Sequence, residues 1–310
     1  MTSGERPGVV IFAPTPLLTV SIERGTTGAE EVHLHAGGQG VWVARMLESL
    51  ECRPIVCGPF GGETGGVAES ILRREGVDVR SVTVAGSTAV NVEENREDGH
   101  ESLVHTEPPP LDRHELDDLY GVMIGAAVGG PAAVLTGSAW PNVLPPSTFR
   151  RLAADLREVG VPVVADLSED QLRAALEGGL AVVKVSDEEL ERDGIITDRS
   201  LDAAVAGLDA LHDMGATDVV ISRDAEPTVA LVGGQRYVVT APSLEIVEAR
   251  GSGDSMTAAL AATLALELDA EAMLRLAVAA GAVNVTRHGL GGADAEVVRE
   301  LAPTIEVRRI

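Results

Sequence analysis

Short apolar runs alternate with amphipathic segments over much of the chain, and this pattern predicts the fold class. The apolar runs lie at 8–13, 133–135, 161–165, 181–183 and 219–221. Each is short enough for a strand that is buried on both faces. Amphipathic segments follow near 147–159, 169–177, 187–192 and 200–214. Because alternating strands and helices are typical of a parallel sheet covered on both faces, we predict an α/β fold.

A second group of strands differs, because apolar and polar residues alternate within them. Residues 18–22 and 32–35 alternate strictly, and residues 82–106 alternate weakly around a charged turn. Such alternation suits strands with one face exposed to water. We therefore expect a second, smaller sheet, to which 82–106 contributes the later pair of strands.

A glycine-rich turn, Arg250-Gly251-Ser252-Gly253-Asp254, lies between an apolar run at 244–247 and a helical segment at 257–268. We expect a strand, a turn and a helix start. Glycines in such a turn direct successive backbone N–H groups into one concavity, which is a seat for an anion. The Asp254 carboxylate would repel a phosphate there unless it takes a proton from an attacking hydroxyl. The alternative is an ordinary loop in which Asp254 caps the helix.

A second glycine loop, Ala36 to Gly40, precedes a helical pattern at 41–50 and would also let a ligand approach the backbone closely. The other segments add ordinary elements. We expect a strand at 55–58, a helix through Ile71 and Leu72, a hairpin at 227–240 and mostly helix at 269–301.

Composition narrows the function classes. The chain has 310 residues and a formal charge of −24, which disfavours a nucleic-acid or anionic membrane surface. Without a long apolar run or a leader-like start, we expect a cytoplasmic protein. Cys52 and Cys57 are expected to be free thiols, and no CxxC metal motif occurs. The single lysine is Lys184.

Several of these segments resemble motifs of the PfkB/ribokinase superfamily of carbohydrate kinases, nearest to its 1-phosphofructokinase and tagatose-6-phosphate kinase branch. The resemblance runs nearly end to end, and its most specific part is Gly251 to Met256. Further similar segments are Ala36 to Gly40, Leu135 to Ser138, Lys184 to Leu190 and Ala277 to Gly289. The resemblance implies a three-layer α/β/α sandwich with a mainly parallel sheet plus a small β-sheet lid.

The resemblance also implies a division of the chain and a set of partners. Residues 1–12, 36–81 and 107–310 would form the nucleotide-binding core, and 13–35 and 82–106 the lid. The enzyme would be a kinase with an alcohol group as acceptor, using ATP with Mg²⁺, and a monovalent cation is left open. The acceptor would be a sugar, polyol or nucleoside. Since lid strands pair between subunits in many relatives, a homodimer through the lid is expected.

Site roles follow from the same resemblance. Asp254 would be the catalytic base, and the N–H groups of Gly251, Ser252 and Gly253 would hold the transferring phosphoryl charge. Glu189 would help to organise Mg²⁺ through water. The nucleotide site would comprise Lys184, Ser222, Arg223 and Asn284. The acceptor site would comprise Gly37, Gly38, Gln39, Trp42 and Thr19.

Departures from the family pattern concentrate on the acceptor side. Thr19 stands at the place of an aspartate, Gln39 at that of a lysine, Trp42 at that of an asparagine and Ala89 at that of an arginine. Neutral Gln39 and Ala89 cannot balance a phosphate dianion, and Trp42 adds a stacking face. We therefore expect a neutral or aromatic-bearing acceptor. On the donor side, 222–225 and 248–250 also differ from the family loops.

Three functions remain open from the sequence. The first is an ATP-dependent sugar or polyol kinase, and the second is a catalytically silent relative that binds a ligand. The third is a nucleoside kinase in which Trp42 stacks on a base. Two smaller questions also remain: His33 and His35 share a strand face and either point at a ligand or metal or decorate the lid, while Asp166 is a site residue or, as we favour, a helix cap.

Overall fold

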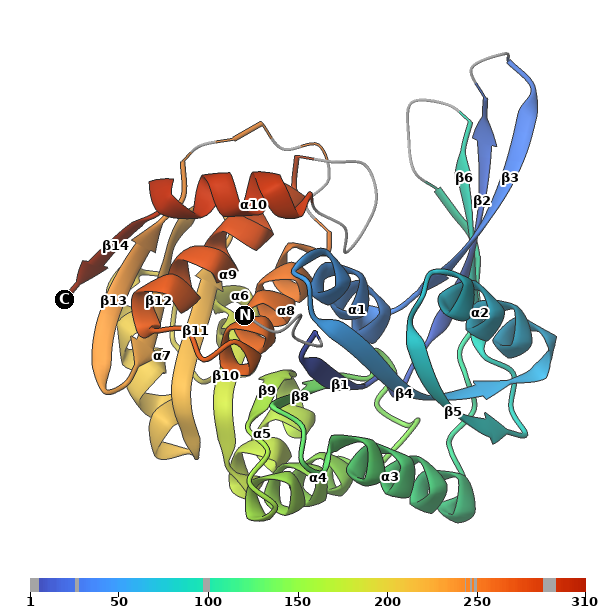
Figure 1. Cartoon of the computed structure of the whole chain (residues 1–310), viewed down its shortest axis with the longest axis horizontal. Coiled ribbons are helices and arrows are strands. Elements are labelled where there is room, and N and C mark those ends of the chain that lie inside the picture. Colours follow the sequence, from blue (N-terminus) through green and yellow to red (C-terminus); the bar gives the residue numbers. More distant parts are fainter. Residues whose placement is uncertain are drawn as a thin grey trace.

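A ten-stranded sheet forms the centre of the molecule (Figure 1). The structure is a computed structural model that describes residues 6–25, 28–96, 101–242, 244–245, 247, 250–286 and 294–310. Strand order is β14-β13-β12-β11-β10-β9-β8-β1-β4-β5. Neighbouring strands from β5 to β11 pair in parallel, and β11 to β14 pair antiparallel. The strands are β1 Gly8–Phe12, β4 Arg53–Gly61, β5 Asp78–Val84, β8 Ala132–Thr136, β9 Val163–Asp166, β10 Leu180–Ser186, β11 Ala216–Arg223, β12 Glu226–Val232, β13 Gln235–Thr240 and β14 Glu306–Arg309.

Helices cover both faces of this sheet, and each face has its own apolar core. On β1, Val9 and Ile11 join one core while Val10 and Phe12 join the other, because successive side chains point to opposite faces. The first core includes side chains from α1 Gln39–Ser49, α2 Gly62–Arg74, α8 Ser252–Ala265, α9 Ala270–Asn284 and α10 Ala295–Leu301. The second includes side chains from α3 Arg113–Ala127, α4 Ser147–Glu158, α5 Glu169–Gly178, α6 Asp187–Arg192 and α7 Leu201–Asp213. A short 3-10 turn, Ala302–Thr304, links α10 to β14. The predicted three-layer α/β/α sandwich is therefore confirmed.

Four further strands form a separate sheet, here called the small sheet. They are β2 Leu17–Arg24, β3 Glu30–Gly37, β6 Ala89–Asn95 and β7 Glu101–His105, in the order β3-β2-β6-β7. In Figure 1 these strands rise away from the ten-stranded sheet beside α1 and α2. The predicted small sheet is thus confirmed, while the division of the chain into core and lid stays a prediction.

Strand register gives the small sheet two chemically different faces. One row across the four strands is His35, Thr19, Asn91 and His105. The adjacent row, on the opposite face, is Leu34, Val20, Val92 and Val104. One face therefore carries hydrogen-bonding groups, and the other carries an apolar stripe.

Most expected elements form, and the differences have physical reasons. Residues 82–84 belong to β5 of the large sheet, because Val79 and Val82 are buried in the main cores, so the later strands of the small sheet begin only at Ala89. Helix α3 was not expected; a capping box at Asp112 and Glu115 begins it. The strand expected at 244–247 does not form at Leu244, Glu245 or Val247, and Ile246 lies outside the described residues. Leu244 and Val247 are exposed, so no sheet buries this run.

Candidate active site

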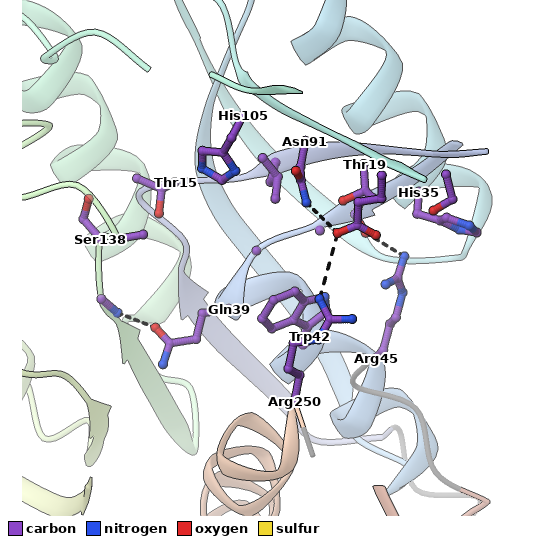
Figure 2. A pocket seen from close by; sticks show the side chains of 18 of the residues that line it. Thr15, Thr19, His35, Gln39, Trp42, Arg45, Asn91, His105, Ser138 and Arg250 are labelled. Carbon is purple, nitrogen blue, oxygen red and sulfur yellow. Dashed lines mark hydrogen bonds and ion pairs between the residues drawn. The ribbon is translucent and has the colours of Figure 1, made fainter. Parts of the chain in front are cut away.

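A cleft of about 1470 Å³ lies between the small sheet and one edge of the core. Its walls come from β2, β3, β6 and β7 on one side and from the start of α1 on the other. The loops after β8 and β9 and the residue Arg250 complete it. Figure 2 shows Thr19, Asn91 and His105 of the small sheet across the cleft from Gln39 and Trp42. The cleft brings together residues that are far apart in the sequence.

The glycine-rich turn starts helix α8. Gly251 is the N-cap with a φ of 81°, a left-handed conformation that favours glycine. Asp254 therefore lies in the first turn of α8 and is not its N-cap, which rules out the capped-loop alternative. The first turn of a helix has backbone N–H groups without intrahelical partners, and such groups can bind an anion. The expected turn and helix start are thus present.

Asp254 and Lys184 are both buried and lie close to one another. A Cβ atom added to Gly253 would lie only 2.4 Å from the Lys184 Nζ atom, so the ammonium group is packed directly against the turn. Lys184 forms an ion pair with Asp166, in which Nζ lies 3.5 Å from Oδ2. The only lysine of the chain is therefore beside the residues 253 and 254 that the sequence singled out.

The pKa values in this cluster are perturbed. Burial raises the pKa of Asp254 to about 8 and the Asp166 charge adds to the rise, whereas Lys184 and a hydrogen bond from Gln39 oppose it. Burial alone would lower the pKa of Lys184, but the carboxylates of Asp166, Glu189 and Asp254 outweigh it and raise the pKa above its ordinary value. A carboxyl group that titrates near neutral pH suits proton transfer.

Asp166 is not a helix cap, contrary to our preferred interpretation of the sequence. Ser168 is the N-cap of α5, and Asp166 is the last residue of β9. Its Oδ2 atom accepts a 2.7 Å hydrogen bond from the Thr257 hydroxyl, in addition to the Lys184 ion pair. Because two partners satisfy the buried carboxylate, Asp166 belongs to the polar cluster with Lys184 and Thr257, and it also lines the cleft.

Residues of the second glycine loop line the cleft as expected. Gly37, Gly38, Gln39 and Trp42 are part of its wall, and so is Thr19 from β2. The Gln39 Oε1 atom accepts a 2.8 Å hydrogen bond from the Gly137 N–H, and its amide nitrogen lies 3.4 Å from the Asp166 carbonyl oxygen. Gln39 therefore links the glycine loop to the loops after β8 and β9.

The residues expected to bind the nucleotide and its metal do not gather in the cleft as the acceptor residues do. Glu189 lines the cleft, but its Oε2 atom accepts hydrogen bonds from the Ser186 N–H and hydroxyl in a capping box that begins α6. Arg223 is buried, forms an ion pair with Asp187 at 3.7 Å and donates to the carbonyl of Arg199 at 2.9 Å.

Two more of these residues, Ser222 and Asn284, contact the backbone. The Ser222 hydroxyl lies 3.4 Å from the Val185 carbonyl, and the Asn284 amide donates to the Arg250 carbonyl at 2.8 Å. Among the residues that the structure describes, the cleft wall contains Asp166 and Glu189, which are neighbours of Lys184, but none of the four predicted nucleotide residues Lys184, Ser222, Arg223 and Asn284. Their nucleotide role stays a prediction.

Several cleft residues were missed from the sequence. Trp140 packs on His105 with ring centroids 5.4 Å apart, and the Arg250 Nη1 atom lies 3.9 Å from the Glu93 Oε1 atom. Asn91 donates a 2.5 Å hydrogen bond to the same oxygen of Glu93. The alternation of β6 could have placed Asn91 and Glu93 on one face, but not opposite Arg250, which is distant in the chain.

The histidines of the small sheet do not form a metal site within the described part of the chain, where no cluster of three or more potential ligands occurs. His33 and His35 stack on each other with centroids 6.2 Å apart. His35 and His105 line the cleft, and His100 lies outside the described residues. Both cysteines are buried free thiols, as expected. None of the described helices has the length and apolar character needed to cross a membrane.

Comparison with solved structures defines the class of fold. The structure of phosphofructokinase-2 from Escherichia coli in complex with potassium superposes with a TM-score of 0.85, at 22% identity over 96% of this chain and 99% of that one. Ribokinase from Arabidopsis thaliana, complexed with ribose and ATP, gives a TM-score of 0.72 at 18% identity, covering 96% and 99% of the two chains. The molecule therefore has the ribokinase-like fold.

Sequence comparison then identifies the family. The model of the pfkB family carbohydrate kinases matches residues 17–296, and the chain belongs to this family. A 1-phosphofructokinase of Vibrio cholerae is 28% identical over 303 residues, which cover 96% of this chain and 95% of that protein. A 1-phosphofructokinase of Bacillus subtilis is 26% identical over 276 residues, 89% of each chain. The protein is accordingly a kinase with an alcohol group as acceptor, as the sequence predicted.

Proposed function

We propose that the protein is an ATP-dependent sugar or polyol kinase in which Asp254 is the catalytic base. The observation that carries this proposal is the buried carboxyl of Asp254 in the first turn of α8, with a pKa of about 8, beside the ammonium group of Lys184. A helix N-terminus favours a bound phosphate, whereas a carboxylate beside that phosphate would repel it. Proton transfer from the acceptor hydroxyl explains why a carboxyl group is found there.

The chemical step follows from this arrangement. The Asp254 carboxylate takes the proton of the acceptor hydroxyl, whose oxygen forms a bond to the γ-phosphorus of ATP. The bond from that phosphorus to the oxygen bridging the β and γ positions breaks, and ADP leaves with the electron pair. The N–H groups of Gly251, Ser252 and Gly253 would stabilise charge on the transferring group. Lys184 would neutralise charge on the nucleotide phosphates.

A magnesium ion fits the donor side only in a hydrated form. Asp187 is engaged by Arg199 at 2.8 Å, and Asp166 is engaged by Lys184 and Thr257. Glu189 lies on α6 and lines the cleft; Ser186 bonds to its Oε2 atom, so Oε1 is the oxygen that a hydrated ion would approach. Mg²⁺ commonly keeps several waters and uses one or two carboxylates together with substrate phosphates, so Glu189 would hold it through water. When bound, the ion would neutralise phosphate charge. The binding of a monovalent cation stays a prediction.

The small sheet supports two further expectations, a lid and a dimer contact. The polar face lines the cleft, so closure of the sheet over an acceptor would exclude water from the site. The opposite face carries Leu34 and Val104, which are 47% and 50% exposed, and a second copy of the chain would cover them.

A charged substitution tests the dimer contact. We expect Leu34→Glu to lower the mass observed by sedimentation to that of a monomer. The matched control is Val159→Glu at the end of α4, because Val159 is equally exposed (47%) and Figure 1 shows α4 well apart from the small sheet. If both variants keep the mass of the unaltered protein, the lid is not the subunit interface.

A catalytically silent ligand-binding relative is the second candidate, and one observation favours it. Thr19, Gln39 and Trp42 line the cleft and Ala89 is buried, and all four differ from the residues that the family resemblance leads us to expect. Phosphorylation of any acceptor at the expense of ATP would exclude this alternative.

One substitution tests the proposed base. Asp254→Asn keeps the shape of the side chain but cannot accept the proton, so we expect turnover to fall by about a thousandfold or more, while nucleotide binding persists. Asp218→Asn is the matched control, because Asp218 is a half-buried aspartate whose pKa is also raised by burial. It accepts a 2.9 Å hydrogen bond from the Gly233 N–H and does not line the cleft. Unchanged turnover in Asp254→Asn would remove the assignment.

A further inference from the structure

The cleft wall of the small sheet carries a row of hydrogen-bonding groups where an acceptor would lie. The row His35, Thr19, Asn91 and His105 crosses all four strands, and all four residues line the cleft. Hydroxyl, amide and imidazole groups donate and accept hydrogen bonds, as the hydroxyls of a polyol require. This row is therefore suited to a polyhydroxylated molecule (Figure 2).

Both tryptophans of the chain also line this cleft. Trp42 lies on α1 three residues after Gln39, and Trp140 lies in the loop after β8, where it packs against His105. Indole rings offer large flat surfaces that favour stacking with another planar group. Two such rings in one cleft indicate an acceptor with a planar part as well as hydroxyls.

The charges of the cleft disfavour a phosphate on the acceptor. Among the described residues, its wall holds the carboxylates of Glu23, Glu75, Glu93, Asp166 and Glu189 and the guanidinium groups of Arg24, Arg45 and Arg250. Two of these arginines already have carboxylate partners. Arg45 contacts both oxygens of Glu75 at 3.0 and 3.1 Å, and Arg250 pairs with Glu93 at 3.9 Å. A phosphate dianion would have to displace these partners or rely on Arg24, the last residue of β2, for its charge balance.

We propose that the acceptor is an uncharged polyol that carries a planar ring, with its hydroxyls on the Thr19–Asn91 row and its ring against Trp42 or Trp140. The proposal rests on the proposed kinase function. It differs from what the names of the 1-phosphofructokinase relatives would suggest, because those proteins are named for a phosphorylated acceptor.

Intrinsic fluorescence tests the proposal directly, since the two tryptophans of the protein both lie in the cleft. The probes are pentoses and hexoses, each as a phenyl glycoside, a methyl glycoside and a phosphate monoester, together with nucleosides. We expect a phenyl glycoside or a nucleoside to change the emission and to bind at least about tenfold more tightly than the methyl glycoside. Phosphate monoesters should bind most weakly.

Variants assign the effect to a ring. Trp42→Leu and Trp140→Leu should each be compared with the Phe variant at the same position. At the position that contacts the ring of the acceptor, the Leu variant should bind the ring-bearing probe about tenfold more weakly, while the Phe variant keeps most of the affinity. Tyr120→Leu on α3 is the control for loss of a ring outside the cleft. Thermal unfolding of each variant excludes misfolding as the cause.

The outcomes separate the acceptor class from catalysis. Tighter binding of a phosphate monoester, equal binding of phenyl and methyl glycosides, or no binding of any ring-bearing probe would overturn the inference. Measuring binding on Asp254→Asn keeps the two claims apart. If a ring-bearing polyol binds but the unaltered protein never phosphorylates it, the proposed catalysis fails and the acceptor class stands.

Discussion

The pH dependence of turnover offers the most direct test of Asp254. Its folded-state pKa of about 8 lies far above the ordinary aspartate value of 3.8, first because of burial and second because of Asp166. Only the deprotonated carboxylate can act as a base. The value of kcat/KM, which reports the free enzyme, should therefore rise with pH and level off above about pH 8.

The size of the effect follows from the titration of one group. Below its pKa, the fraction of deprotonated Asp254 falls tenfold per pH unit, so kcat/KM at about pH 6 should be about a hundredfold below its plateau. Replacing Asp166 with Asn removes the neighbouring charge and leaves Lys184 to favour the Asp254 carboxylate. The acidic limb should then move to lower pH by about one unit or more.

The assay is a coupled measurement of ADP release between about pH 5.5 and about pH 9.5 at constant ionic strength, with the coupling enzymes in excess. Asp218→Asn is again the control and should leave the limb in place. A flat profile from about pH 6 to about pH 9, or an unmoved limb in Asp166→Asn, would refute the reasoning.

The free energy of unfolding should fall as pH rises, whereas kcat/KM should increase. Because the folded protein holds the Asp254 proton more tightly than the unfolded chain, this group favours folding most at low pH. Its contribution is lost as pH rises from about 4 through the folded-state value of about 8. Urea unfolding at several pH values should show this loss in the unaltered protein and a smaller one in Asp254→Asn.

Three further substitutions, the first with a control, test a close contact, a backbone conformation and a helix cap. Gly253→Ala would place a Cβ atom 2.4 Å from the Lys184 Nζ atom, so kcat should fall at least about tenfold, whereas Gly125→Ala in α3, with open space around it, should leave kcat unchanged and raise the unfolding free energy by about 0.5–1 kcal/mol. Asp224→Gly should add about 1 kcal/mol and raise Tm by about 2–4 °C in a thermal melt, because Asp224 has a left-handed φ of 51°. Asp112→Ala should cost about 1 kcal/mol in urea unfolding, because it removes the capping box of α3.

The layers of the fold were predictable because they depend on local pattern. Buried runs such as 181–183 and amphipathic segments such as 169–177 became β10 and α5, and alternating residues became strands of the small sheet. The boundary of that sheet was not predictable, since β5 alternates too. Whether Val82 packs on the core or faces a lid depends on distant helices, which a local pattern does not contain.

Some residues of the candidate site could likewise be predicted from the sequence, and others could not. The turn at Gly251 and the position of Lys184 could be found from the sequence, because each follows from a short motif. Asp166 could not be assigned, since a strand-end aspartate before a helix looks like a cap until Lys184 and Thr257 are known to lie beside it. Pairs such as Arg250 with Glu93 depend entirely on how the small sheet sits over the core.

Gln39 connects the acceptor side of the cleft to the base. It lines the cleft, accepts a hydrogen bond from Gly137 and lowers the pKa of Asp254 through a hydrogen bond. A lysine here, as the family resemblance expects, would bring a positive charge near Asp254 and lower its pKa further. The neutral residue therefore does two things at once: it removes a charge that a phosphorylated acceptor would need, and it leaves Asp254 a stronger base. Burial and Asp166 raise the pKa of Asp254, and the neutral Gln39 opposes that rise less than a lysine would.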